Sequence, residues 1–167
     1  MAVVTFKGNP IHTSGELPAV GRKAPDFALT GTDLADVSLK DFADKTVVLN
    51  IFPSVDTPVC AASVRRFNAE VDKLGGAVVL CASADLPFAH ARFCGAEGLE
   101  RVRSVSDLRD KAFGERYGVK IVEGPLAGLL ARSVVVVGKD GNVAYTQLVP
   151  EIGQEPDYES VLAAVRR

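Results

Sequence analysis

The chain has 167 residues, of which 47% are hydrophobic and 24% charged, and its formal net charge at pH 7 is −2. These values are typical of a folded globular protein, exclude an intrinsically disordered chain, and suit a single domain spanning residues 1–167. The slightly acidic balance, without a basic cluster, argues against partners such as nucleic acid or an anionic membrane.

No stretch approaches the roughly 20 apolar residues that a transmembrane helix needs. Residues 1–8 also lack the basic and apolar regions of a secretory signal, so we expect a cytoplasmic protein. In that compartment stable disulfides are rare, and those that form are usually catalytic or redox-sensing. The three cysteines therefore suggest chemistry more than scaffolding.

The first third of the chain predicts short strands and turns before one buried strand. The residues at 46–52 are β-branched and almost continuously apolar, which is typical of a central strand. The expected elements are a hairpin of residues 3–6 and 11–13 within residues 1–15, a short strand at 27–29, a helical turn at 38–42, and the buried strand at 46–52.

The remainder predicts alternating helices and strands, ending in a hairpin and a helix. The expected elements are a helix from Pro58 that stops at Gly75, a strand at 77–83, a helix at 87–93, a Gly-rich loop at 95–98, a strand at 102–105, a helix at 108–117 stopped by Gly118, an ordered loop at 124–130, hairpin strands at 133–137 and 142–148, and a helix at 157–166. The strands at 46–52 and 77–83 flank one helix, which predicts a parallel βαβ unit. The order predicts a mixed sheet with helices on both faces and leaves several α/β sandwiches open.

The segment between the first buried strand and its helix places a cysteine in an unusual position. Thr57 stands where an N-cap belongs, and Pro58 follows at the first helical position, so Cys60 falls at the third. Unpaired backbone N–H groups and the helix dipole favour an anion there, and the thiolate is the nucleophilic form of cysteine. A lone cysteine on an apolar helix face is, however, more often a small buried hydrophobe. Position alone leaves both interpretations open.

Longer motifs decide between these interpretations. The octapeptide 53–60 resembles the Pro-x-x-x-Thr-x-x-Cys motif of the peroxiredoxins, and the run 83–94 and the segments 124–126 and 131–132 are similar to the thiol peroxidase branch of that family. The resemblance covers nearly the whole chain and implies a thioredoxin-like fold, a mixed central sheet flanked by helices, with an added N-terminal hairpin. Pro58 departs from the Gly of many relatives, but proline suits the first helical position.

The resemblance implies a thiol-dependent peroxidase that reduces hydrogen peroxide and alkyl hydroperoxides in antioxidant defence. It makes Cys60 the peroxidatic cysteine and Cys94 the resolving one, joined in an intramolecular disulfide as in atypical two-cysteine peroxiredoxins. Thr57 would hydrogen-bond the sulfur and the peroxide in addition to capping the helix, Pro53 would shield the sulfur from water, and Arg132 takes the place of the active-site arginine. The resemblance also implies a homodimer that is recycled by thioredoxin and that uses no cofactor.

The other candidates are weaker. Cys81 lies within an apolar strand and is expected to be buried and inert, whereas His90 is expected at the surface. A metal site formed by His90 and Cys94 with Cys60 or Cys81 would lack a second ligand pair, and no Cys-x-x-Cys of a thioredoxin-type oxidoreductase is present. A peroxide-sensing redox relay would use the same cysteine pair and remains the alternative function. Since both cysteines lie on or beside helices, their disulfide is expected to require local unwinding.

Overall fold

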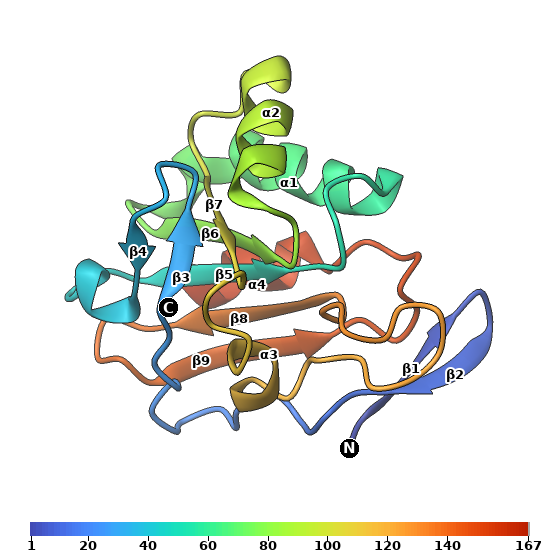
Figure 1. Cartoon of the computed structure of the whole chain (residues 1–167). Helices are drawn as coiled ribbons and strands as arrows, with labels where there is room; N and C mark the ends of the chain where they lie inside the picture. Colours follow the sequence, from blue (N-terminus) through green and yellow to red (C-terminus); the bar gives the residue numbers. More distant parts are fainter. Residues whose placement is uncertain (167) are drawn as a thin grey trace.

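A seven-stranded mixed sheet forms the centre of the computed structural model, which describes residues 1–166 (Figure 1). In spatial order its strands are β4 (Asp36–Val37), β3 (Leu29–Gly31), β7 (Arg103–Ser106), β6 (Val78–Ser83), β5 (Val47–Ile51), β8 (Ser133–Val137) and β9 (Val143–Leu148). β5, β6 and β7 run parallel, and the other neighbours pair antiparallel. The predicted mixed sheet and its parallel βαβ unit are confirmed.

Apolar side chains alternate between the two faces of the central strands, as the two-residue period of a strand requires. From β5, Val48 packs against the helices α1 (Pro58–Glu70), α2 (Pro87–Glu97) and α4 (Tyr158–Val165). Its neighbour Leu49 packs on the other side with η1 (Leu39–Phe42) and α3 (Phe113–Arg116). Figure 1 shows α3 in front of the sheet and α4 behind it. Helices therefore cover both faces, as predicted.

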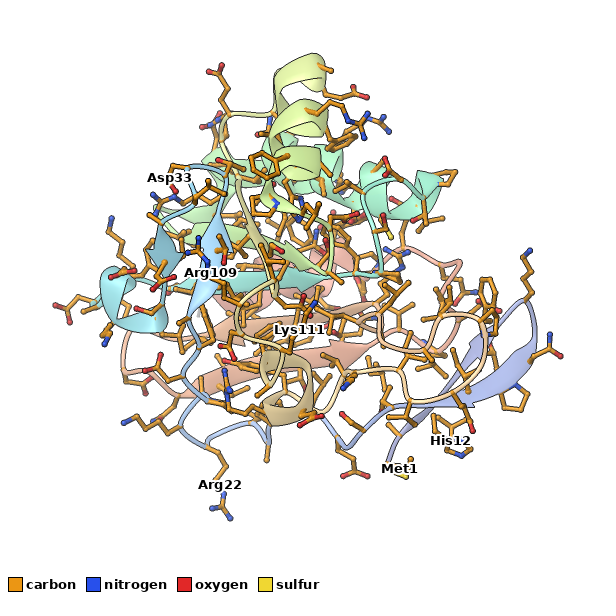
Figure 2. The ribbon with its side chains drawn as sticks, viewed as in Figure 1. Met1, His12, Arg22, Asp33, Arg109 and Lys111 are labelled. Carbon is orange, nitrogen blue, oxygen red and sulfur yellow. The ribbon has the colours of Figure 1, made fainter. Side chains whose placement is uncertain are left out.

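The predicted N-terminal hairpin is confirmed as a separate two-stranded sheet of β1 (Val3–Phe6) and β2 (Asn9–His12). Its turn lies at Lys7 and Gly8, which both have positive φ, so β2 begins two residues earlier than expected. The hairpin projects at one end of the molecule, where Figure 2 labels Met1 and His12. It is attached through Thr5, whose N–H donates to the carbonyl of Pro150 (2.8 Å).

At the opposite end, the predicted strand at 27–29 is wrong in position and a partner strand was missed. β3 begins at Leu29 and pairs with the two-residue strand β4. Ala28 cannot join it because its N–H donates to the Asp110 carboxylate (2.9 Å). The turn between the strands is held by Arg109, which donates to the Leu34 carbonyl (2.9 Å) and lies beside this hairpin in Figure 2.

The helix predicted at 87–93 continues to Glu97, so the expected loop at 95–98 is wrong. α2 ends where Gly98 adopts φ +67° and the N–H of Leu99 donates back to the Cys94 carbonyl (2.9 Å). This is the closing hydrogen bond of a Schellman motif. As a consequence, Cys94 lies inside the last turns of a helix and not at its end.

The helix predicted at 108–117 is also wrong in extent, because α3 covers only Phe113–Arg116. In the residues that precede α3, side chains take part in hydrogen bonds that compete with a helix. The N–H of Leu108 donates to Ser106 Oγ (3.1 Å), and the Asp110 carboxylate accepts from the N–H of Ala28, just before β3. The stop at Gly118 is confirmed. Its φ is +69°, and a Cβ there would collide with the backbone of Glu16.

The other elements follow the prediction closely. α1 continues into η2 (Val71–Leu74) and stops at Gly75 with φ +58°, and the β8–β9 hairpin and α4 lie within two residues of their expected bounds. The segment 124–130 forms no helix or strand of its own, as expected of a loop. Among residues 1–166, no helix is both long and apolar enough to cross a membrane.

Candidate active site

Cys60 lies in the first turn of α1, in the register that the sequence predicts. Thr57 is the N-cap residue with extended backbone angles, and Pro58 is the first helical residue. The thiol is fully buried and packs among apolar side chains of β5, α1 and β8. The sulfur of Cys60 therefore lies both at the N-terminus of a helix and in the buried interior.

Arg132 brings a guanidinium to this sulfur. Its Nη2 donates to Cys60 Sγ at 3.1 Å, and its Nε donates to the carbonyl of Ile152 at 2.9 Å. The topology explains the contact: β8 is antiparallel to β5, so that Ser133 pairs with Ile51 and the residues just outside both strands meet at one edge of the sheet. The sequence places Arg132 beside β8, and the pairing brings it to the cysteine.

The charge of Arg132 has an unusual environment. The side chain is only 1% exposed, no carboxylate within residues 1–166 forms an ion pair with it, and its Nη1 has no hydrogen-bond partner there. An unpaired buried guanidinium is costly, and a neighbouring thiolate offsets this cost. The arrangement therefore places a cation on the Cys60 sulfur and leaves Nη1 of Arg132 for a further oxygen acceptor.

Thr57 and Pro53 lie on the segment that leads from β5 to Cys60. The hydroxyl of Thr57 donates to the Ser54 carbonyl (3.0 Å) and makes no capping hydrogen bond to α1, so the capping part of the prediction is wrong. A hydroxyl whose proton is engaged in one hydrogen bond can still accept others through its oxygen. Thr57 is exposed, whereas Pro53 is buried at the end of β5.

The structure does not bring Cys94 to Cys60. All three cysteines are free thiols, and Cys94 is half-buried on α2 with its Sγ 3.3 Å from the hydroxyl of Ser104 in β7. Cys60, by contrast, faces Arg132. The two predicted redox cysteines thus lie in adjacent helices on one face of the sheet, each with its own partner.

Cys81 is buried in the middle of β6, as predicted. Its sulfur lies 3.6 Å from the side-chain amide of Asn50, which is the donor of that contact. Burial raises the pKa of the Cys81 thiol to about 12, which keeps it protonated at neutral pH.

His90 is fully buried, so its expected place at the surface is wrong. It lies one turn before Cys94 on the inward face of α2, edge-on to the ring of Phe52, with Nε2 3.0 Å from Ser83 Oγ. Burial lowers the pKa of His90, although the nearby Asp85 carboxylate acts in the opposite sense. Among residues 1–166, no group of three or more His, Cys, Asp or Glu side chains is arranged to hold a metal ion.

Sequence reasoning missed a polar cluster beside the site. Asp85 accepts hydrogen bonds from Ser54, from the backbone of Val55 and from Ser83. A signal was available, because Ser54 and Asp85 lie shortly after the carboxyl ends of the parallel strands β5 and β6, where functional groups of α/β proteins gather.

Comparisons with known proteins identify the family of the chain. The Redoxin family model matches residues 19–162. Thiol peroxidases of Mycobacterium tuberculosis (strain H37Rv) and Mycobacterium bovis are each 64% identical to the chain over 165 residues, which is 99% of both sequences. The chain belongs to the thiol peroxidase branch of the peroxiredoxins. The resemblance drawn from the motifs is thereby confirmed, and with it the expectation of a thiol-dependent peroxidase.

Solved structures of peroxiredoxins share the fold. A peroxiredoxin-like protein from Aquifex aeolicus is 40% identical and superposes with a TM-score of 0.93, covering 99% of this chain and 96% of that one. A thiol peroxidase from Chromobacterium violaceum, 23% identical, has a TM-score of 0.88 and covers 98% and 95%. The predicted thioredoxin-like fold is confirmed.

Proposed function

We propose that Cys60 is the peroxidatic cysteine of this thiol peroxidase and that Arg132 activates it. The observation that carries the proposal is the 3.1 Å hydrogen bond from Arg132 Nη2 to Cys60 Sγ, made by two side chains that are both buried. The guanidinium stabilises the thiolate, and the planar fork of donors leaves Nη1 for a peroxide oxygen.

In the first step the Cys60 thiolate attacks one oxygen of the hydroperoxide. The S–O bond forms as the O–O bond breaks, the sulfur is oxidised to sulfenic acid, and the other oxygen leaves with a proton as water or alcohol. Negative charge moves from sulfur to the leaving oxygen, so fixed donors lower the barrier most when they face both atoms. Arg132 has one donor on the sulfur and one unpartnered, which suits this shift of charge.

Thr57 and Pro53 take supporting roles in the proposal. The Thr57 hydroxyl donates to Ser54, so toward the peroxide it acts as an acceptor and would receive the O–H of the substrate. Pro53, buried at the end of β5, has no N–H group and excludes water from the sulfur. An acceptor and a donor on opposite sides would fix the O–O bond in line with the thiolate.

We assign Cys94 the resolving role. Its thiol condenses with the Cys60 sulfenic acid to give an intramolecular disulfide and water. This step removes the sulfenic acid before a second peroxide can oxidise it further. A disulfide requires Cα atoms within about 7 Å, and Cys94 lies in a helix against Ser104. Because each cysteine lies in a helix with its own partner, we expect local unwinding of α2, or of the first turn of α1, before the bond forms.

The remaining parts of the proposal concern partners and setting. Hydrogen peroxide and alkyl hydroperoxides are the substrates, and the dithiol of thioredoxin reduces the disulfide to two thiols while becoming a disulfide itself. The slightly acidic chain fits the absence of a nucleic-acid or membrane partner. From the family we also propose a cytoplasmic homodimer with a role in antioxidant defence. We also propose that residues 1–167 form one domain, which the Redoxin match over residues 19–162 supports.

The mass of the intact chain under non-reducing conditions tests the cysteine assignments. After one equivalent of peroxide, the wild type should lose about two mass units, for two hydrogens, and Cys94→Ser should instead gain one oxygen as a trapped sulfenic acid. Cys81→Ala should behave like the wild type. A bridge that survives Cys94→Ser, or oxygen gained by the wild type without a bridge, would contradict the pairing.

A turnover assay on the same protein distinguishes an enzyme from a redox relay. With thioredoxin, its reductase and excess peroxide, an enzyme consumes many equivalents of peroxide per chain. A peroxide-sensing relay would form the disulfide once and pass it only to a particular partner. We expect sustained turnover with thioredoxin.

A further inference from the structure

A chain of hydrogen bonds joins the loop before Cys60 to the helix that carries Cys94. Its centre is Asp85, in the turn between β6 and α2. Asp85 Oδ1 accepts from Ser54 Oγ (2.7 Å), and Oδ2 accepts from the N–H of Val55 (2.8 Å) and from Ser83 Oγ (2.5 Å). Ser83 Oγ in turn contacts His90 Nε2 of α2 (3.0 Å). The carboxylate thus contacts the loop before Cys60 directly and reaches α2, which bears Cys94, through Ser83 and His90.

The directions of these bonds are fixed by counting protons. The carboxylate of Asp85 only accepts, so the single hydroxyl proton of Ser83 must point to it. Ser83 Oγ therefore accepts from the other two groups that it contacts, the N–H of Asp85 (3.1 Å) and Nε2–H of His90. This assigns the proton of His90 to Nε2, because the network requires a donor there.

Burial makes this network costly to break. Ser83 and His90 are fully buried, and Asp85 is half-buried. If Asp85 is removed, the N–H of Val55 and the hydroxyl of Ser83 lose their acceptor, and an unsatisfied buried donor costs more than the hydrogen bond gains. The same loop has a second, exposed link to α2, the ion pair of Asp56 with Arg92 (3.2 Å), whose side chains are 65% and 68% exposed. Exposed pairs of this kind contribute little.

We propose that Asp85, oriented by Ser83 and His90, is a positioning residue for the peroxide step of this thiol peroxidase. It fixes the turn at Ser54 and Val55, and this turn also receives the hydroxyl of Thr57 through the Ser54 carbonyl. Asp85 thus sets where the loop presents Thr57 to a peroxide on Cys60, without touching the substrate. The inference rests on the proposed roles of Cys60 and Thr57.

The network also links the two half-reactions. His90 lies one helical turn before Cys94, so unwinding α2 for disulfide formation pulls on Ser83 and, through it, on Asp85. We infer that an intact α2 helps to hold the peroxide-binding loop in place, through His90, Ser83 and Asp85. Breaking the network should therefore slow peroxide attack and should not slow disulfide formation.

The test uses Cys94→Ser as the parent chain, in which the sulfenic acid accumulates and can be trapped and weighed after rapid quenching. Asp85→Ala should slow sulfenic acid formation about 10- to 100-fold, since small misplacements of a reacting group cost that much. Asp85→Asn keeps one acceptor oxygen for Val55 and Ser83 and should fall between Asp85→Ala and the parent. Asp56→Asn, the matched control in the same loop, should equal the parent.

A second readout separates positioning from general damage. The rate at which iodoacetamide alkylates Cys60 at pH 7 depends on the thiolate and on access, not on Thr57, so it should stay within about twofold of the parent. If alkylation falls as much as the peroxide rate, or if Asp85→Asn is as slow as Asp85→Ala, the positioning role is wrong. Should Asp85→Ala not fold, Ser54→Ala removes one of the same bonds and should show the same split.

The link to α2 has its own pair of variants. His90→Leu removes the donor to Ser83 and should slow the peroxide step less than Asp85→Ala, whereas His90→Gln supplies a side-chain N–H and should recover part of the rate. In chains that retain Cys94, disulfide formation from the sulfenic acid should be no slower than in the wild type, and a slower one contradicts the link. If the parent forms no sulfenic acid, the proposed function fails; if it does and Asp85→Ala matches it, only this inference fails.

Discussion

Cys60 and Cys81 are equally buried, with no exposed surface on either side chain, yet their surroundings are opposite. Cys60 begins a helix and accepts a hydrogen bond from the guanidinium of Arg132. Cys81 lies in mid-strand, where all nearby backbone groups are paired in the sheet and its polar neighbour is the neutral amide of Asn50. The first environment supplies a cation beside the sulfur, and the second supplies none.

With Cys60 as the proposed peroxidatic residue and Cys81 inert, burial alone does not decide the reactivity of a cysteine. Burial without a compensating charge raises the pKa of Cys81 to about 12, whereas burial beside an unpaired cation strengthens an ionic contact because the local dielectric is low. The same sheet face provides both environments, one in the first turn of the helix that follows β5 and the other in the middle of β6. The following predictions test this contrast.

Substitution of the two cysteines should affect peroxide turnover very unequally, and this is the largest effect that we predict. Cys60→Ser should reduce peroxide turnover to the uncatalysed background, because a serine hydroxyl is not ionised at pH 7 and cannot form a sulfenic acid. Cys81→Ala should retain turnover within about twofold, since its thiol makes no contact with Arg132 or Thr57. Coupled assays with thioredoxin measure both. Turnover lost equally in the two variants would remove the distinction.

Removal of the Arg132 guanidinium should leave Cys60, like Cys81, buried without a neighbouring cation and therefore slow to react with peroxide. Arg132→Met should slow sulfenic acid formation by about 10²- to 10³-fold, the usual cost of losing one fixed donor to developing charge. Arg132→Lys should recover only part of this, because one ammonium cannot reproduce the fork that reaches both Ile152 and the sulfur. Arg92→Met, which removes an exposed arginine, serves as the control and should leave the rate unchanged.

Asn50 connects the two cysteines and allows stability to be separated from reactivity. Its amide donates to Cys81 Sγ and to Ser63 Oγ (3.2 Å), and Ser63 donates to the Cys60 carbonyl (2.8 Å). Ser63→Ala should lower the free energy of unfolding by about 1–3 kcal/mol, because the buried amide loses an acceptor. The peroxide rate should hardly change, since Ser63 contacts the carbonyl and not the sulfur. Denaturant unfolding and rapid-quench rates would measure the two, and a slow enzyme of normal stability would contradict this assignment.

The sequence predicted what depends on local pattern. The register of Thr57, Pro58 and Cys60 follows from capping preferences, and the burial of Cys81 follows from an apolar strand. Arg132 was found only through family motifs, because its contact with Cys60 depends on the antiparallel pairing of β5 and β8, which lie about 80 residues apart.

The errors have the same origin. The helix at 108–117 was overestimated because Ser106 and Asp110 bond backbone groups that a periodic pattern does not reveal. His90 was expected at the surface, whereas its buried partner Ser83 lies seven residues away on a different element. Tertiary hydrogen bonds, rather than apolar periodicity, determine both where α3 begins and where the His90 side chain lies.

The smallest predicted effect is a pH dependence of stability that comes from Cys81 alone. In the unfolded chain its thiol ionises near pH 8.5, whereas in the folded chain burial holds its pKa at about 12. Between these values the folded state binds more protons, so the free energy of unfolding of the wild type should fall as the pH rises, by about 1 kcal/mol per pH unit from this group. Cys81→Ala lacks the group and should show a shallower decline between pH 9 and 10.5, with all other titrating groups in common. Denaturant unfolding of the two reduced proteins across this range measures the difference. Parallel declines would mean that Cys81 ionises as readily in the fold as outside it, and the contrast with Cys60 would then rest on Arg132 alone.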